Sequence, residues 1–338
     1  MKKLFYFAAM LLFTLTACEK NFDSPKADTD LYEGEGTLKV SLAYETFPGS
    51  KAVTDYTEVL EAEKAEKKVA IYVFDKTSGL LNVSKTLSKT SDAFSVTVPA
   101  GEKTVYAVVN GPDLSTVTTI AQMSAATDNL TNTTLAANGL TMVGSADCTV
   151  QAGVPATAAI TVRRLVARVV IEKITNSLPA AYGKMTIDAV YLGNANSVQT
   201  FAGSSSSIVN PYGYADINKT QAIGKNNITG SCSDYMFRRI STDVAVGNSF
   251  TTPQYLYCHP NSTDTPTSVH ILLTAGGKQH YYHLDLDGGI QSNYTYSVSV
   301  NIKFPGENGP SDKHEKGELN ATITVAGWSA GNDYTAEF

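Results

Sequence analysis

Short runs in which apolar and polar residues alternate recur along the chain, with clusters of Gly, Pro, Asn, Ser and Thr between them. An alternation of period two places alternate side chains on one face of a β-strand, so each run predicts a strand. The predicted strands are residues 37–46, 68–75, 93–98, 103–110, 158–174, 185–192, 254–258, 268–275, 279–286, 294–304 and 319–326. Short strands separated by turn residues predict β-sandwiches and not an α/β enzyme.

The first and the last of these runs alternate most cleanly. In residues 37–46, one face would carry Leu38, Val40, Leu42 and Tyr44. In residues 319–326, one face would carry Leu319, Ala321, Ile323 and Val325. Each strand is therefore expected to bury one face and to expose the other. Residues 68–75 are apolar on both faces instead, which predicts a strand in the interior of the molecule.

Other segments lack this alternation. Residues 58–68, rich in Glu, Lys and Ala, predict a solvent-exposed helical turn, and residues 114–127 predict a second short helix. The stretch of Gly, Ser, Asn and Tyr from residue 193 to about residue 227 predicts a long surface insertion. Because the strand pattern restarts beyond residue 176, we expect two β-sandwich domains, residues 37–176 and 177–338.

The N-terminus has the form of a targeting signal. Two lysines precede an apolar run, residues 4–15, which is too short to span a bilayer and predicts a signal peptide over residues 1–17. Residues 15–18 (Leu-Thr-Ala-Cys) resemble the bacterial lipobox, in which the cysteine is acylated and becomes the first residue. We therefore expect the mature chain to begin at a lipidated Cys18, outside the cytoplasm. A plain secretory signal with an incidental cysteine is the alternative.

Composition narrows the function. The chain has 338 residues, of which 43% are hydrophobic and 17% charged, so it can bury a large core. Its formal net charge of −6 argues against a nucleic-acid partner. The sequence contains no GxSxG, HExxH, CxxC, P-loop or dinucleotide-binding motif. We therefore expect neither an enzyme nor a cofactor.

The remaining candidates for chemistry are isolated. On a strand, His280 and His283 would fall on opposite faces, which does not suit shared metal ligation, so no metal site is predicted. Asp285 and Asp287 would share a face, but the Gly-Gly pair after them favours a hairpin turn. The arginines at positions 163, 164 and 168 could bind an anion, although arginines paired at a domain junction are the commoner situation.

Three cysteines follow the lipobox: Cys148, Cys232 and Cys258. Because this number is odd, at least one stays unpaired. Cys232 and Cys258 could form a disulfide or could each be a small buried side chain, and their spacing does not decide between the two.

Four segments, in this order, resemble the fimbrillins, the shaft subunits of type V pili. Residues 66–79 look like their opening strand, and residues 141–144 (Thr-Met-Val-Gly) look like their Met-x-Gly turn. Residues 164–169 are similar to the strand at the domain junction. Residues 294–304 and 319–328, separated by a loop rich in Gly and Pro, resemble the C-terminal hairpin that ends in a Trp. With the lipobox, the resemblance covers most of the mature chain.

This resemblance implies an all-β fold of two tandem transthyretin-like β-sandwich domains with short helices in loops. It also implies that a trypsin-like protease removes the N-terminal strand and that a C-terminal segment of a neighbouring subunit fills the groove by β-augmentation. The family usually has an Arg at the cleavage site, whereas this sequence has no Arg between Cys18 and Lys68. We therefore expect cleavage between Lys51 and Ala52, which makes residues 18–51 a propeptide.

The resemblance assigns two sets of residues to strand exchange. The removable strand would be that of Leu38, Val40, Leu42 and Tyr44. The donor would be that of Leu319, Ala321, Ile323 and Val325, or the tail through Phe338. The implied partners are other pilus subunits (copies of this chain, anchor and tip proteins), the processing protease, and the outer membrane through the lipid anchor.

The sequence thus predicts a structural pilus subunit for cell adhesion, made as an outer-membrane lipoprotein precursor and then part of an extracellular fimbria. An anchor or tip subunit of the same pilus is one alternative. A monomeric surface lipoprotein that binds glycans is an alternative of another class. Its exposed aromatic platform would consist of Tyr212, Tyr214 and Tyr235.

Overall fold

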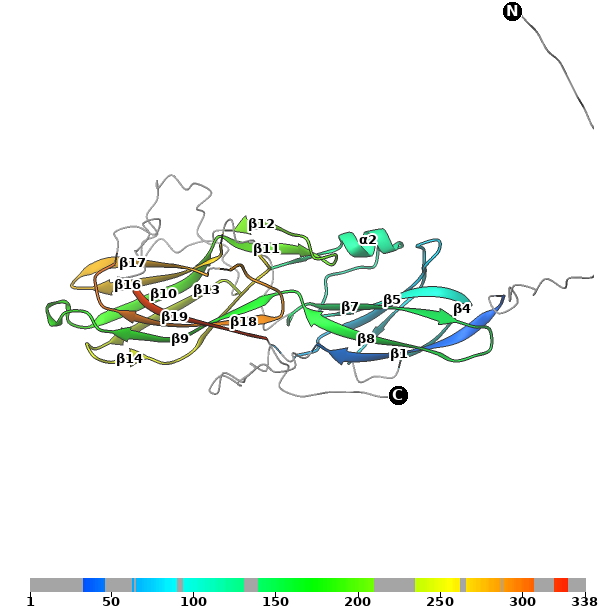
Figure 1. The fold of residues 1–338 in the computed structure, drawn as a ribbon, viewed down its shortest axis with the longest axis horizontal. Helices are drawn as coiled ribbons and strands as arrows, with labels where there is room; N and C mark the ends of the chain where they lie inside the picture. Colours follow the sequence, from blue (N-terminus) through cyan, green and yellow to red (C-terminus); the bar gives the residue numbers. More distant parts are fainter. Residues whose placement is uncertain are drawn as a thin grey trace, which may run out of the picture.

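The computed structural model describes residues 33–45, 63, 65–89, 94–130, 139–209, 235–261, 266–286, 288–306 and 319–327. Nearly all the regular structure in these residues is β-strand, arranged in two halves that follow one another along the long axis (Figure 1). This architecture confirms the all-β fold class predicted from the alternation. Among the described residues, no helix is long and apolar enough to cross a membrane.

The N-terminal half is built on a seven-stranded sheet in the order β3-β2-β5-β7-β8-β1-β4. The strands are β1 (Glu35–Tyr44), β2 (Val69–Asp75), β3 (Leu81–Leu87), β4 (Phe94–Pro99), β5 (Gly101–Val109), β7 (Met142–Val150) and β8 (Ala156–Arg164). β7 and β8 pair only through Met142 and Val143. Side chains from both sides of this narrow contact share one apolar core, so the sheet folds over into a sandwich.

A second apolar cluster covers the outer face of β2, which explains why this strand is apolar on both faces. The outward side chains of β2 pack against Met123 of α2 (Ile120–Ala125). The N-cap of this helix is Thr119, whose Oγ1 accepts a hydrogen bond from the Gln122 N–H at 3.1 Å. The helix is shorter than the predicted residues 114–127 because the capping box fixes its start at Thr119.

The C-terminal half has two facing layers. One layer contains β9 (Ala167–Asn176), β14 (Ser249–Phe250), β15 (Gln254–Cys258), β18 (Tyr294–Ile302) and β19 (Leu319–Gly327). The other is a four-stranded sheet of β10 (Met185–Gly193), β13 (Phe237–Val244), β16 (Ser268–Ala275) and β17 (Lys278–Asp285). The largest apolar cluster of the molecule lies between these layers, and a short helix, η2 (Ala180–Tyr182), precedes β10.

A small sheet occupies part of the region predicted to be a surface insertion, so that prediction is wrong for its first part. β11 (Ala195–Thr200) pairs with β12 (Ser205–Val209) and with β6 (Thr127–Asn129), which precedes β7 in the sequence. β11 is polar but buried: the Asn196 side chain, for example, donates a hydrogen bond to the Pro260 carbonyl at 2.6 Å. Because such hydrogen bonds replace apolar contacts, the strand carries no hydrophobic alternation.

The predicted strand of residues 158–174 is two strands that belong to different halves. β8 lies in the N-terminal sheet, whereas β9 pairs with β18 and β15 of the C-terminal half. The chain passes between the sheets at Leu165 and Val166, which are buried one after the other. The change of sheet therefore occurs one strand before the predicted boundary at residue 176. The predicted Met-x-Gly turn is also wrong, because Met142, Val143 and Gly144 begin β7.

Candidate functional site

β1 lies in the interior of its sheet although it precedes every other described strand. It pairs in parallel with β8, from Leu38 opposite Ala156 to Tyr44 opposite Val162. On its other side it pairs antiparallel with β4, from Glu35 opposite Pro99 to Val40 opposite Phe94. Both edges of β1 therefore carry ladder hydrogen bonds, and its neighbours β4 and β8 are not paired with one another.

The apolar face of β1 is buried as the alternation predicts. Leu38, Val40 and Leu42 are 0%, 3% and 6% exposed, and Tyr44 is half-buried against the same core. They pack with side chains of β8 such as Ile160. Without β1, a groove bounded by β4 and β8 would expose this part of the core to water. The structure thus places these four residues together in one groove, which we call the β1 groove.

The end of β1 reaches the junction between the two halves. The Tyr44 hydroxyl donates a hydrogen bond to the carboxylate of Glu66, which lies in the segment that leads into β2. The next residue, Glu45, accepts a hydrogen bond at its Oε2 from the Asn293 side-chain amide of the C-terminal half at 2.8 Å. β1 therefore contacts both halves, which alternation alone does not indicate.

A buried charge cluster holds Glu63, which lies between β1 and β2 in the sequence, against the C-terminal half. The Glu63 carboxylate bonds to Arg168 of β9 at 2.9 Å and accepts a hydrogen bond from the Tyr257 hydroxyl of β15 at 2.5 Å. Burial raises the pKa of Tyr257 well above its ordinary value, and the nearby Glu63 carboxylate raises it further, so the hydroxyl stays protonated and donates. Glu63 is fully buried, which corrects the prediction of a solvated helical turn at this residue.

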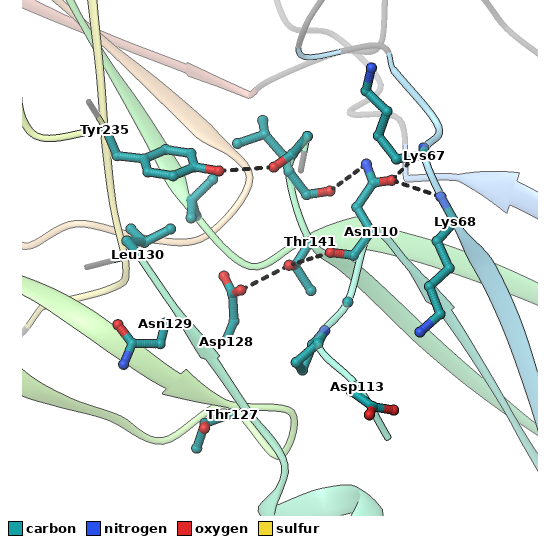
Figure 2. Close-up of a pocket in the computed structure, with 15 residues that line it drawn as sticks. Lys67, Lys68, Asn110, Asp113, Thr127, Asp128, Asn129, Leu130, Thr141 and Tyr235 are labelled. Carbon is teal, nitrogen blue, oxygen red and sulfur yellow. Dashed lines mark hydrogen bonds between the residues drawn. The ribbon is translucent and has the colours of Figure 1, made fainter. Parts of the chain in front are cut away.

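Asn110, just after β5, fastens residues 65–68, which follow Glu63 in the sequence. It has a positive φ of 55°, and its Oδ1 accepts a hydrogen bond from the Lys67 N–H at 2.7 Å. Its amide Nδ2 donates to the Ala65 carbonyl at 2.8 Å. Figure 2 shows Asn110 and Lys67 beside a cavity at the junction, which is also lined by Asp128 and Tyr235 and has a volume of about 440 Å³. Segment 65–68 is thus anchored directly before β2.

β19, which carries the predicted donor residues, lies at the edge of its sheet among the described strands. Of these strands it pairs with β18 alone, antiparallel, from Leu319 opposite Ile302 to Gly327 opposite Tyr294. Ala321 and Ile323 are half-buried against the C-terminal core, and Val325 lies opposite Tyr296 in the register. The structure therefore places the predicted donor strand on the C-terminal half and not in the β1 groove of the same chain.

A family model of the fimbrillin-A associated anchor proteins Mfa1 and Mfa2 matches residues 28–333. The chain belongs to this family. The match confirms the resemblance to fimbrillins and makes this a fimbria-associated protein of the cell surface, with pilus subunits as its class of partner. The family consists of structural fimbrial proteins and not of enzymes. Among curated proteins, none matches the chain.

Solved structures similar to this family member share its fold. A candidate cell adhesion protein of Bacteroides eggerthii DSM 20697 is 18% identical with a TM-score of 0.60, over 88% of this chain and 98% of that one. A candidate cell adhesion protein of Parabacteroides distasonis ATCC 8503 is 19% identical with a TM-score of 0.59, over 89% and 99%. The fimbrilin FimA of Porphyromonas gingivalis W83 is 16% identical with a TM-score of 0.56, over 88% and 98%.

Other candidate residues of this fimbrillin-associated protein have structural partners. His280 Nδ1 lies 3.0 Å from the Gly306 carbonyl, and His283 Nε2 lies 2.8 Å from the Asp285 carboxylate. Arg168 forms the buried pair with Glu63, as expected for a junction arginine. Within the described part of the chain, no three His, Cys, Asp or Glu side chains are grouped as a metal site would need.

Two of the predicted cysteines are free thiols, and one tyrosine of the predicted glycan platform is buried. Cys148 and Cys258 are free, and burial raises the pKa of Cys258 to about 12, so this thiol is a buried, unreactive side chain. Tyr235 is 2% exposed and donates a hydrogen bond to the Gly139 carbonyl at 3.1 Å. It therefore cannot belong to an exposed glycan platform. The predicted residues that lie outside the described part of the chain are Cys18, Lys51, Ala52, Tyr212, Tyr214, Cys232, Asp287 and Phe338.

Proposed function

We propose that this protein is a structural pilus subunit, secreted as a lipoprotein precursor and polymerised by strand exchange. In this proposal, proteolysis frees β1, and a strand of a neighbouring subunit then occupies the β1 groove. The single observation that carries the proposal is the position of β1: an early strand buried between β4 and β8, with its apolar face in the core. Such a strand can be exchanged for another of the same pattern without changing the rest of the sandwich.

Cleavage after Lys51 is the step that would free β1. Lys51 is the only Lys or Arg between Tyr44 and Glu63. Lys39 lies within the paired strand β1, and Lys67 lies in the segment that Asn110 anchors. A cut at Lys51 would therefore separate β1 from the body of the protein and leave the buried Glu63 cluster in place.

Approximate free energies explain why proteolysis must precede strand exchange. Four apolar side chains contribute about 1.5–3 kcal/mol each, and each ladder hydrogen bond adds about 1 kcal/mol. A donated strand can thus offset association costs of about 4–15 kcal/mol. The tethered β1, however, competes at an effective concentration of about 1 mM, so a neighbour at about 1 μM is disfavoured by about 4 kcal/mol. Removing the tether removes this competitor.

The donor in this proposal is β19 or the tail through Phe338. β19 alternates like β1 and pairs with one neighbouring strand in the part of the chain that the structure describes, so its release would break one of the described ladders and not two. Ala321 and Ile323 are only half-buried, so their departure would expose less of the apolar core than the departure of the fully buried Leu38 would. Partners are then copies of this chain together with anchor and tip subunits.

Limited trypsin treatment of the full-length protein tests this proposal. We expect cleavage before Ala52, followed by concentration-dependent polymers that are visible by size-exclusion chromatography and electron microscopy. Lys51→Gln should stay monomeric under the same treatment. Ile323→Asp should cut normally but polymerise poorly, whereas Thr322→Asp, on the exposed face of β19, should polymerise as the parent does. If the cut protein stays monomeric at high concentration after the β1 segment has gone, strand exchange is wrong.

The description of the family as anchor proteins favours one second candidate, an anchor subunit that keeps its lipid. N-terminal sequencing of protein taken from the cell surface separates the two roles. A chain that begins at Ala52 indicates a polymerised shaft subunit, whereas only an acylated Cys18 indicates the anchor.

A further inference from the structure

The turn between β7 and β8 closes one end of the β1 groove. This turn and the start of β1 lie at the end of the N-terminal half that points away from the C-terminal half (Figure 1). The Gly153 N–H of the turn donates to the Glu35 carbonyl of β1 at 3.1 Å. The Gln151 carbonyl accepts a hydrogen bond from the Val154 N–H at 3.3 Å. The turn therefore lies directly against the backbone of β1, and its own hydrogen bond holds its shape.

Gly36 of β1 passes this turn with no room for a side chain. A Cβ atom at this position would lie 2.3 Å from the Gln151 carbonyl oxygen and 2.7 Å from Cγ1 of the fully buried Val150. Gly36 does not have the positive φ that favours glycine, so it is glycine for reasons of space and not of backbone conformation. Because the obstructing oxygen belongs to the backbone of the turn, it stays in the groove when β1 leaves.

This obstruction fixes the register of any strand in the groove. The side chains of β1 that face the core are two residues apart, so apolar alternation alone would also allow a strand that is shifted by two residues. The Gln151 carbonyl removes this freedom wherever the shift brings a side chain against it. A strand therefore fits when a glycine lies two residues before its first groove-facing apolar residue, as Gly36 lies before Leu38.

The sequence of β19 and the residues before it meets this condition. Gly317 lies two residues before Leu319. When Gly317 is placed at Gly36, the groove-facing residues Leu38, Val40, Leu42 and Tyr44 are replaced in order by Leu319, Ala321, Ile323 and Val325. A shift by two residues would instead place Glu315 or Leu319 against the Gln151 carbonyl. One register is thus compatible with both the obstruction and the apolar face.

The tail after β19 does not meet the condition. Gly327 is followed two residues later by Ser329, and Gly331 is followed two residues later by Asp333. Either polar side chain would take the place of Leu38, which is 0% exposed in the core of the N-terminal half. Burying a polar group without a hydrogen-bond partner is costly, so the tail is a poor occupant of this groove.

We propose that Gln151 and Val150 form a register stop in the β1 groove, which selects β19 of a neighbouring subunit as the donor. The donor strand enters with the polarity of β1 and with Gly317 at the place of Gly36. This proposal rests on the strand-exchange function proposed above. It adds the identity of the donor, β19 and not the tail through Phe338, and the register in which the donor binds.

Fluorescent peptides test the stop on full-length protein that has been cut by trypsin and freed of the fragment containing β1. After trypsin has been inhibited, the dissociation constant of a peptide of residues 316–327 is measured by anisotropy. We expect its Gly317→Ala variant to bind about 10-fold to 100-fold more weakly, because the added Cβ overpacks the stop. Asn320→Ala, at the position that replaces the exposed Lys39, is the matched control and should bind like the parent peptide. A peptide of residues 328–338 should not compete.

Disulfide trapping reads the register without reference to affinity. In the proposed register, Thr322 takes the place of Ser41, which lies opposite Ala159 of β8. A Thr322→Cys peptide should therefore form a disulfide with Ala159→Cys protein. Asn320→Cys and Thr324→Cys peptides should not, because each is displaced by two residues, about 6.6 Å, along the strand. Mass spectrometry identifies the cysteines that are joined.

A reference peptide of residues 35–45, the sequence of β1 itself, separates this proposal from strand exchange as such. Equal affinity of the parent and Gly317→Ala peptides overturns the register stop. A disulfide formed by the Asn320→Cys or Thr324→Cys peptide overturns the register, and tighter binding of the tail peptide overturns the choice of donor. Strand exchange survives each of these results as long as the reference peptide binds. If no peptide binds, the reference included, the groove cannot be refilled and strand exchange itself is wrong.

Discussion

At the junction between the halves, Glu63 bonds to two residues of the C-terminal half. Its carboxylate is fully buried, and both of its oxygens are used, one by Arg168 and one by Tyr257. A buried ion pair is tolerated only when its hydrogen bonds are satisfied, because both ions have lost their water. Removing one partner therefore leaves an uncompensated charge, which costs more than the pair contributes.

We expect Glu63→Ala to lower the free energy of unfolding by about 3–5 kcal/mol, because it removes the carboxylate that neutralises the buried Arg168. Tyr257→Phe removes one hydrogen bond to a charged group and should cost about 1.5–3 kcal/mol. Denaturant unfolding followed by tyrosine fluorescence measures both. The control is Glu102→Ala, on an exposed position of β5, which should change the free energy of unfolding by less than about 0.5 kcal/mol. Similar values for Glu63→Ala and Glu102→Ala would contradict the role of the cluster.

The sequence could not reveal this cluster. Glu63 lies among Glu, Lys and Ala residues that look solvent-exposed, and its partners are 105 and 194 positions away. Asn293 and Glu45 are 248 positions apart and have no pattern in common. Hydrophobic periodicity reports which face of a strand is buried, but it contains no information on which polar side chains meet across the molecule.

At the scale of elements, the alternation identified the strands that bury one apolar face. It predicted β1 and β19 almost to their ends because Leu38 and Ile323, for example, occupy alternate positions that face a core. It missed β11, whose buried side chains are polar, and β13, which lies at the edge of its sheet with many exposed residues. For such strands, neighbouring strands and side-chain hydrogen bonds determine the conformation, and local pattern does not.

At Gly144, the backbones of β7 and β8 come too close together to leave room for a side chain. β7 and β8 meet here, and a Cβ atom on Gly144 would lie 2.2 Å from the Thr161 carbonyl oxygen of β8. Backbone cannot move aside cheaply, so Gly144→Ala should force the two strands apart and lower the free energy of unfolding by about 1–3 kcal/mol. Thermal unfolding monitored by circular dichroism measures this loss. Ser145→Ala, the next position and exposed, is the matched control and should be neutral. An equally stable Gly144→Ala protein would show that β7 and β8 can separate freely.

For the whole molecule, strand exchange requires that β1 leave both β4 and β8. A covalent link between β1 and β8 would therefore prevent assembly even after the tether has been cut. Ser41 and Ala159 are direct partners in the parallel register, and both side chains lie on the outer face. Adjacent strands lie about 4.8 Å apart, within the Cα separation that a disulfide spans. The buried Cys258, with its raised pKa, would not compete for oxidation.

The double variant Ser41→Cys/Ala159→Cys, in a Cys232→Ser background, should therefore be cut by trypsin yet remain monomeric while oxidised. Reduction with dithiothreitol should restore polymerisation, because it frees β1 and not because it changes the groove. The single variant Ser41→Cys should polymerise under both conditions. Light scattering before and after reduction follows the reaction, and mass spectrometry confirms the cross-link. If the oxidised, cut double variant polymerises as fast as the reduced one, subunits join without vacating the β1 groove, and the link between proteolysis and assembly must lie elsewhere in the molecule.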